Sequence, residues 1–165
     1  MAWATVFPDG RFLFCGRVFR CALGRTGVST EKREGDGATP AGALVLRRLL
    51  WRADRLERPL AVVPAAPLSP AAGWCDDPGD AAYNTEIRLP HSASHERLWR
   101  EDALYDLVGV LGWNDAPPVP GRGSAIFLHV AAPGHTPTAG CVALAVPDLL
   151  AVLAEGLAGL RVLPP

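Results

Sequence analysis

The residues with the clearest chemical potential lie in one stretch, LHVAAPGHTPTAGCVAL, at residues 128–144. It holds His129, His135 and Cys141 among prolines and glycines, with an apolar, strand-like run at each end. Three interpretations are open. The stretch is a loop that presents Cys141 to a substrate, a metal clip, or a hairpin that merely contains a buried thiol.

A cysteine nucleophile needs a base within hydrogen-bond reach, and backbone N–H groups to hold the oxyanion that develops. His129 lies in the apolar run AIFLHV, and Cys141 begins a second apolar run twelve residues later (141 − 129). Two adjacent strands would bring this imidazole and thiol together. Gly140 lets the backbone approach a substrate closely, so the N–H groups of Gly140 and Cys141 are candidate oxyanion donors.

Structural interpretations compete with catalysis here. A lone cysteine at the start of an apolar run is more often a core residue, and a strand histidine is usually a satisfied core side chain. Zinc fits less well, because His129, His135 and Cys141 are spaced six and six residues apart (135 − 129, 141 − 135), unlike the tight spacings of structural zinc. His91 and His95 stand in a serine-rich turn. We therefore expect no metal, and an incidental role for His135.

Composition describes a globular chain of one domain, residues 1–165. Its residues are 49% hydrophobic, which is enough to form a core. Its formal charge of -1 gives no reason to expect nucleic acid or an anionic membrane as a partner. No run approaches the ~18 apolar residues of a transmembrane helix, and the start shows no signal-peptide pattern. All four cysteines are expected to be thiols, with Cys15 and Cys21 as small strand residues.

The elements that must position these residues read as short strands. A hairpin is expected at Pro8-Asp9-Gly10, because turn-formers separate two apolar runs there. Further strands are expected over residues 17–23, 43–51, 60–64, 85–90, 104–114 and 124–131, with a helix as the alternative for residues 43–51.

Two long irregular stretches and two helices complete the pattern. Residues 24–42 read as a surface loop, and residues 64–84 as a flap over the domain surface. Ser94 is expected to cap a brief helix over residues 96–102, and Pro147 opens a helix through LLAVLAEGL. The fold class is therefore mainly β, a sandwich or barrel with one or two short helices and long loops.

Five segments in order, GRTGV, GDGATPAGALVL, WCDDPGDAAYN, GSAIFLH and TPTAGCVAL, resemble the L,D-transpeptidase catalytic domain, the YkuD-like family. The resemblance implies a YkuD-like β-sandwich. In that family a strand histidine activates a cysteine within a Ser/Thr-His-Gly-Cys motif. His129 matches the base, Thr138 the hydroxyl position, Gly140 the glycine and Cys141 the nucleophile.

The match departs from the family pattern at two positions. Ala139 stands where the motif has a second histidine, and Ala143 where an arginine is common. The spacing from His129 to Cys141 is also shorter than usual. These departures leave both central catalytic groups in place and indicate a divergent branch with altered substrate contacts.

The resemblance implies a reaction on peptidoglycan stem peptides, with no metal or nucleotide cofactor. Cys141 would attack a carbonyl at or beside diaminopimelate, forming a thioester, and an amine of a second stem would resolve it into a 3,3 or 1,3 crosslink. Resolution by water would make the enzyme an L,D-carboxypeptidase or amidase. A non-catalytic wall-binding module is the remaining alternative. The family setting is the periplasm or cell envelope.

Candidate substrate contacts follow from the stem's chemistry and from the resemblance. Carboxylates favour arginine, which nominates Arg25 and Arg122. Tyr83 and Asn84 match a recurrent Tyr-Asn pair of the family, and Thr138 lies beside the nucleophile. No acidic residue stands at a spacing suited to orienting the catalytic histidine; a backbone carbonyl could take that role, and the sequence leaves the orienting group open.

Overall fold

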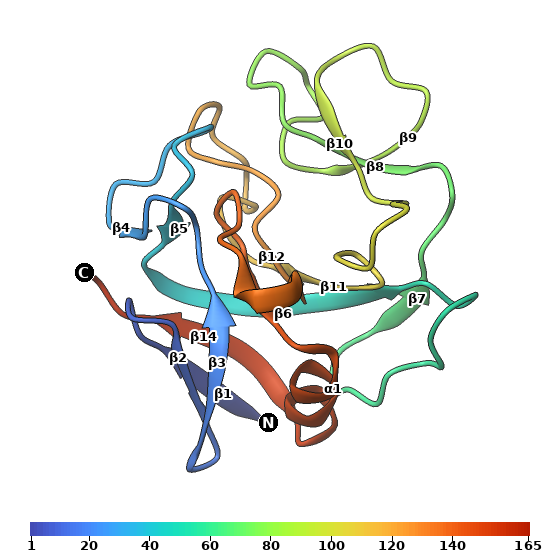
Figure 1. The fold of residues 1–165 in the computed structure, drawn as a ribbon. Helices are drawn as coiled ribbons and strands as arrows, with labels where there is room; N and C mark the ends of the chain where they lie inside the picture. The colour runs from blue at the N-terminus through green and yellow to red at the C-terminus, as the bar shows by residue number, and fades with distance from the viewer.

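The computed structural model describes residues 1–165, which form fourteen strands, one α-helix and one 3-10 turn (Figure 1). The strands are β1 (Ala2–Val6), β2 (Arg11–Phe14), β3 (Arg17–Ala22), β4 (Val28–Ser29), β5 (Thr39–Pro40), β6 (Gly42–Trp51), β7 (Ala65–Pro67), β8 (Ala72–Cys75), β9 (Glu86–Arg88), β10 (His95–Arg97), β11 (Leu107–Leu111), β12 (Phe127–Val130), β13 (Val142–Leu144) and β14 (Leu157–Val162). The helix is α1 (Val146–Ala154), and the 3-10 turn is η1 (Pro133–His135). No helix is long and apolar enough to span a membrane.

Nine strands form one sheet in the order β11-β12-β13-β3-β2-β1-β14-β6-β7, and β6 pairs with β11 as well. The long β6 makes this closure possible, since its first half pairs with β14 and its second half with β11 and β7. The sheet therefore curls on itself around a large hydrophobic core of Leu, Val and Phe side chains. The mainly β fold class is confirmed.

The first two hairpins show how local sequence shapes this sheet. Gly10 has a φ of 89° in the predicted hairpin turn between β1 and β2. Cys15 and Gly16 form the next turn with φ values of 48° and 77°, as a two-residue turn between twisted strands requires. All four cysteines are free thiols, as predicted. The prediction that Cys15 is a strand residue is wrong, because it occupies this turn and is exposed.

Strands β8, β9 and β10 form a separate three-stranded sheet, which we call the flap, above one end of the curled sheet (Figure 1). Its Trp74 ring packs edge-on against Phe127 of β12, with ring centroids 5.1 Å apart. These side chains belong to a second hydrophobic cluster, distinct from the core inside the curled sheet. Of the stretch predicted as a flap, residues 64–84, β7 joins the large sheet instead, and the part from β8 onward belongs to this flap, which aromatic burial anchors.

Two predicted elements are wrong. Residues 95–97 form β10 instead of starting a helix, because they pair with β8 and the fully buried Leu98 follows them. That pairing outweighs the local helix cap. Residues 60–64 run as turns before β7, since their apolar side chains are largely exposed and find no strand partner. The helix predicted at Pro147 is confirmed as α1.

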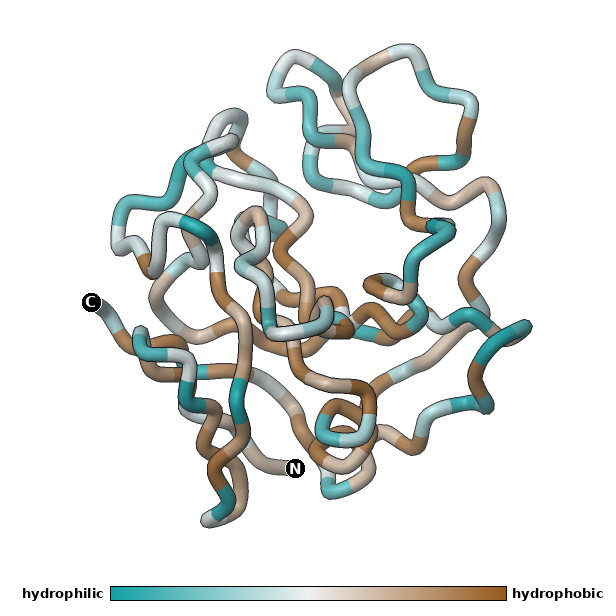
Figure 2. Tube along the Cα trace, in the orientation of Figure 1, coloured by the Kyte–Doolittle hydropathy of each residue, from teal (hydrophilic) through white to brown (hydrophobic).

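Strand β12 divides its side chains between the two hydrophobic clusters. Leu128 and Val130 point into the large core, whereas Phe127 belongs to the cluster beneath the flap. Because side chains alternate along a strand, His129 shares the face of Phe127. Figure 2 shows the corresponding separation, with hydrophobic segments in the curled sheet and hydrophilic ones concentrated in the overlying loops. The fold therefore aims His129 away from the main core.

Candidate functional site

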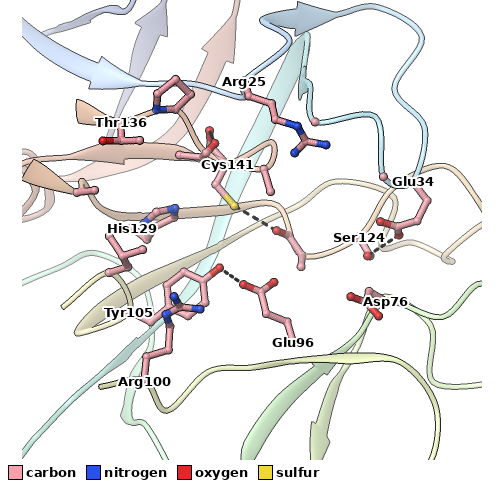
Figure 3. A pocket seen from close by; sticks show the side chains of 18 of the residues that line it. Arg25, Glu34, Asp76, Glu96, Arg100, Tyr105, Ser124, His129, Thr136 and Cys141 are labelled. Carbon is pink, nitrogen blue, oxygen red and sulfur yellow. Dashed lines mark hydrogen bonds between the residues drawn. The ribbon is translucent and has the colours of Figure 1, made fainter. Parts of the chain in front are cut away.

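A cavity of about 480 Å³ lies between the flap, the loop of residues 24–42 and the connection from β12 to β13. Four of the residues predicted from the sequence line it, namely Arg25, His129, Thr138 and Cys141. Figure 3 shows the His129 ring and the Cys141 sulfur at the same wall of this cavity. The structure therefore gathers residues that lie far apart in the sequence at a single site.

The parallel pairing of β12 with β13 sets the relation of His129 to Cys141. His129 pairs with Ala143, and the N–H of Phe127 points at the Cys141 sulfur at 3.4 Å. The thiol therefore stands opposite Phe127, and His129 follows one pleat repeat further along, roughly 6.8 Å, on the same face. The imidazole and the thiol therefore lie on the same face of the β12–β13 pair, offset by two residues along the strands.

A backbone carbonyl fixes the orientation of the His129 ring. Its Nδ1 lies 2.8 Å from the carbonyl oxygen of Val130, an acceptor only, so Nδ1 carries the proton. Nε2 is left with a free lone pair, as a general base requires. The Tyr105 ring stacks edge-on against the imidazole with centroids 5.2 Å apart. A backbone carbonyl, and no carboxylate, therefore orients this histidine.

Burial keeps both central groups neutral. Burial lowers the pKa of His129 to about 4, against hydrogen bonds that raise it. Burial also raises the pKa of the Cys141 thiol to about 12, and the Glu96 carboxylate adds to this increase. The Phe127 N–H and the Lys32 ammonium act in the opposite direction. At neutral pH the resting pair is consequently a thiol beside an unprotonated imidazole.

The lowered pKa of His129 makes stability depend on pH. In the unfolded chain the imidazole protonates near pH 6.5, whereas in the folded protein it stays neutral down to about pH 4. Stability is therefore lost as pH falls through this window, by about 3 kcal/mol. We expect urea unfolding to show a greater loss between pH 7 and pH 4 for the wild type than for His129→Gln. Equal losses in both proteins would contradict a buried, neutral His129.

Thr138 and Gly140 shape the backbone that presents Cys141. The Thr138 hydroxyl donates to the Cys141 carbonyl at 2.8 Å and accepts from the Gly140 N–H at 3.1 Å. Gly140 has a φ of 137°, and a Cβ there would lie 2.8 Å from the Ala38 carbonyl oxygen, so only glycine fits. Since the Gly140 N–H already has a partner, the Cys141 N–H is the better placed of the two predicted oxyanion donors.

Tyr83 and Asn84 lie outside the cavity lining and tie the flap to the site. The Asn84 side chain accepts from the Trp74 indole and the Ala125 N–H, and donates to the carbonyls of Trp113 and Asn114. Ala125 has a φ of 53°, and its carbonyl accepts from the Cys141 thiol at 3.3 Å. Asn84 therefore positions the segment that contacts Cys141, and its own polar atoms are all occupied by the chain.

Asn84→Ala is expected to destabilise the protein. It would leave two buried donors and two carbonyls without partners, and alanine would tolerate the φ of 56° less well than asparagine. We expect the free energy of unfolding to fall by about 3–5 kcal/mol. Chemical denaturation measures this, with Tyr83→Phe as the control that loses one hydroxyl and about 1 kcal/mol. A loss below that of Tyr83→Phe would contradict the positioning role of Asn84.

Tyr83, in contrast to Asn84, connects the flap to the loop of residues 24–42. Its hydroxyl donates to Glu34 at 2.7 Å and accepts from the Gly123 N–H at 3.0 Å. The Ser124 hydroxyl donates to the same carboxylate at 2.5 Å. Glu34 lines the cavity, so Tyr83 acts on the site through Glu34.

Sequence reasoning missed a buried cation in the loop of residues 24–42. The side chain of Lys32 is 3% exposed and pairs with Asp36 at 2.5 Å. Although burial alone would raise the pKa of Asp36, hydrogen bonds from Lys32 and from two backbone N–H groups lower it. A Cβ at Gly140 would lie only 3.4 Å from the Lys32 ammonium. The loop thus delivers a positive charge to the backbone that precedes the nucleophile.

A second group missed from the sequence is Glu96 of the flap, which reaches His129 only through Tyr105, the ring that stacks on the imidazole. The Tyr105 hydroxyl donates to Glu96 of β10 in a short hydrogen bond, and Arg100 lies over the Tyr105 ring. Burial raises the pKa of Glu96, against the hydrogen bond from Tyr105 and the charge of Arg100. The expected helix over residues 96–102 concealed this group, because it placed Glu96 at an exposed helix start.

The two predicted arginines have different surroundings. Arg25 projects over the cavity in Figure 3, and its guanidinium takes part in none of the ion pairs. Arg122 lies in two shallow depressions outside the cavity, beside Trp113. The structure therefore brings Arg25 to the site and leaves Arg122 away from it.

Comparison with known proteins gives one match. The model of a family described as the L,D-transpeptidase catalytic domain (YkuD) matches residues 5–162. Searches of curated proteins and of solved structures found no match. The matched range contains every strand of the curled sheet except the first residues of β1, and it contains the whole cavity.

Proposed function

The chain belongs to the L,D-transpeptidase catalytic-domain family, and on that premise we propose that it crosslinks peptidoglycan stem peptides through a thioester on Cys141. The observation that supports this proposal is that Cys141 and His129 line one wall of the cavity, and that the Nδ1 hydrogen bond of His129 leaves its Nε2 free to accept a proton. The family sets the protein in the cell envelope.

The first step is acylation of Cys141. Nε2 of His129 accepts the thiol proton as sulfur attacks the donor carbonyl, which forms the C–S bond and a tetrahedral oxyanion. Collapse of the oxyanion breaks the amide bond, and the imidazolium returns its proton to the leaving amine. Because burial holds the pKa of the thiol at about 12, proton transfer must accompany the attack.

The second step returns the enzyme to its resting state. The side-chain amine of a second stem attacks the thioester and loses its proton to His129, so the new amide forms as the C–S bond breaks. The proton then passes back to the sulfur. Asp76 lines the cavity and has a buried carboxylate oxygen, Oδ1, without a hydrogen-bond partner. We assign it to the incoming amine, and Arg25 to a stem carboxylate.

Lys32 supports the oxyanion in this scheme, because its ammonium lies beside the backbone that leads to Cys141. Lys32→Met keeps the buried volume and removes the charge, and the partly exposed Asp36 can be solvated. We expect kcat/KM for acylation to fall about 100-fold. Arg33→Met is the matched control, since Arg33 is an exposed cation next in the chain. Equal acylation rates for the wild type and Lys32→Met would show that Lys32 takes no part in the acylation step.

Mass spectrometry of the protein incubated with defined tetrapeptide stems tests the function directly. We expect an adduct on Cys141 followed by crosslinked dimers. Cleaved stems without dimers would support the L,D-carboxypeptidase or amidase alternative on the same scaffold. Stem binding without any adduct, together with a Cys141 thiol inert to iodoacetamide and to carbapenems, would support a non-catalytic wall-binding module and overturn the proposal.

A further inference from the structure

Three potential metal ligands meet in the flap, away from the catalytic cavity. Cys75 ends β8, Asp80 lies in the loop from β8 to β9, and His91 lies in the loop from β9 to β10. One donor atom from each, the Cys75 sulfur, an Asp80 oxygen and a His91 nitrogen, lie within 4.8 Å of one another. None of the three lines the catalytic cavity.

The distances suit a tetrahedral zinc ion after slight contraction. Zinc bonds of about 2.0–2.3 Å place neighbouring ligand atoms roughly 3.3–3.8 Å apart. Nε2 of His91 is already 3.4 Å from Oδ2 of Asp80. The Cys75 sulfur, within 4.8 Å of both, needs to approach by at most about 1 Å.

The His91 nitrogen in this cluster is otherwise unexplained. Nε2 of His91 is buried and has no hydrogen-bond partner. A buried polar atom without a partner costs free energy, so it calls for a ligand or an ion at that point. The thiol at the end of β8 and the carboxylate and imidazole from two loops converge, and together they form a mixed N, O and S donor set.

The charges around Cys75 favour a cation. The carboxylates of Asp76, Asp77 and Asp80 all lie near the Cys75 thiol. Three carboxylates beside one thiol create a negative local potential, which a divalent ion would neutralise. A bound ion would also displace the thiol proton to solvent.

We propose that Cys75, Asp80 and His91 bind a zinc ion, with water as the fourth ligand. Thiolate and imidazole favour zinc over magnesium or calcium, which prefer oxygen ligands throughout. The ion would join the two loops of the flap, whose neighbouring residues Asp76 and Glu96 line the catalytic cavity. None of its three ligands lines the catalytic cavity, so the site is independent of the proposed crosslinking reaction.

The sequence alone conceals this site. The three ligands are separated by five and eleven residues (80 − 75, 91 − 80), and no two of them share the short spacings of zinc motifs. Only the pairing of β8 with β9, which folds the two loops together, brings His91 to Cys75.

Metal titration of the purified, chelator-treated protein tests the proposal. We expect one zinc ion per chain in competition with a chromophoric chelator, and a thiolate-to-cobalt charge-transfer band when cobalt is used instead. Cys75→Ser, Asp80→Asn and His91→Gln should each weaken binding by roughly 100-fold or more, beyond the 10–100-fold of outer-shell changes. His95→Gln is the matched control, because its ring lies 6.3 Å from that of His91 outside the cluster.

A further variant tests whether the metal binds at the catalytic thiol, Cys141, instead of at the proposed site. Cys141→Ser should bind zinc and cobalt as the wild type does. Loss of the cobalt band in Cys141→Ser with its retention in Cys75→Ser would overturn the proposal, as would unchanged binding in all three ligand variants.

Thermal unfolding provides a second readout. Zinc in 100-fold excess over its dissociation constant should raise the wild-type unfolding temperature by roughly 5–10 °C. The shift should vanish in Asp80→Asn and His91→Gln, whose partly exposed side chains allow folding even where Cys75→Ser does not fold. An equal shift in the wild type and in these two variants would exclude the site.

Discussion

Cys141→Ser is expected to lower the rate of acyl transfer to stem peptides by about 10⁴-fold or more, to the level of the background reaction. A serine hydroxyl is a weaker acid than the thiol, and burial of Cys141 already raises the pKa of the thiol to about 12. His129 would therefore have to remove a proton from a group that releases it even less readily. Single-turnover mass spectrometry of the acyl-enzyme measures the loss.

Two other cysteines supply the controls for this experiment. Cys15→Ser changes an exposed turn residue, and Cys21→Ser changes a buried strand residue remote from the cavity. Both variants should acylate at the wild-type rate if they are folded. An undiminished adduct in Cys141→Ser, or loss of the adduct in Cys15→Ser, would assign the nucleophile elsewhere.

Local sequence was sufficient for the elements that depend on local chemistry. The turn at Gly10, the long strand β6 and the start of α1 at Pro147 were all predicted, because glycine conformation, apolar runs and proline at a helix start act within a few residues. His129 and Cys141 were predicted as site residues from local sequence as well. His129 lies in one apolar run, Cys141 begins the next, and turn residues separate the two runs.

Elements that depend on distant partners were missed. β10 became a strand only because β8 lies beside it, so a cap at Ser94 was a misleading local signal. Lys32 looked like one charge among several in a polar loop, and its burial depends on Asp36 and on the connection before Cys141. Neither alternation nor spacing along the chain encodes such contacts, whose energies arise from pairing across the fold.

Asn84 illustrates an intermediate case. Its match to a Tyr-Asn pair located it near the site, yet the expected role was contact with the stem backbone. In the structure all four of its hydrogen-bonding positions are occupied by the chain itself. A motif can therefore mark the right region while leaving the physical role to be decided by the hydrogen bonds that the fold completes.

His129→Gln should have the second largest effect on the reaction. Removing the general base should lower the acylation rate by about 10²–10⁴-fold at neutral pH. Because burial lowers the pKa of His129 to about 4, the wild-type imidazole is unprotonated throughout the neutral range. The wild-type rate should therefore be nearly independent of pH between about 6 and 9.

The pH profile distinguishes a lost base from a general structural defect. Without His129 the reaction depends on the small fraction of thiolate, and the pKa of Cys141 is about 12. The His129→Gln rate should therefore rise about tenfold for each pH unit. His135→Gln, which changes an imidazole outside the cavity lining, should keep the flat wild-type profile. A flat profile for His129→Gln would show that some other group accepts the thiol proton.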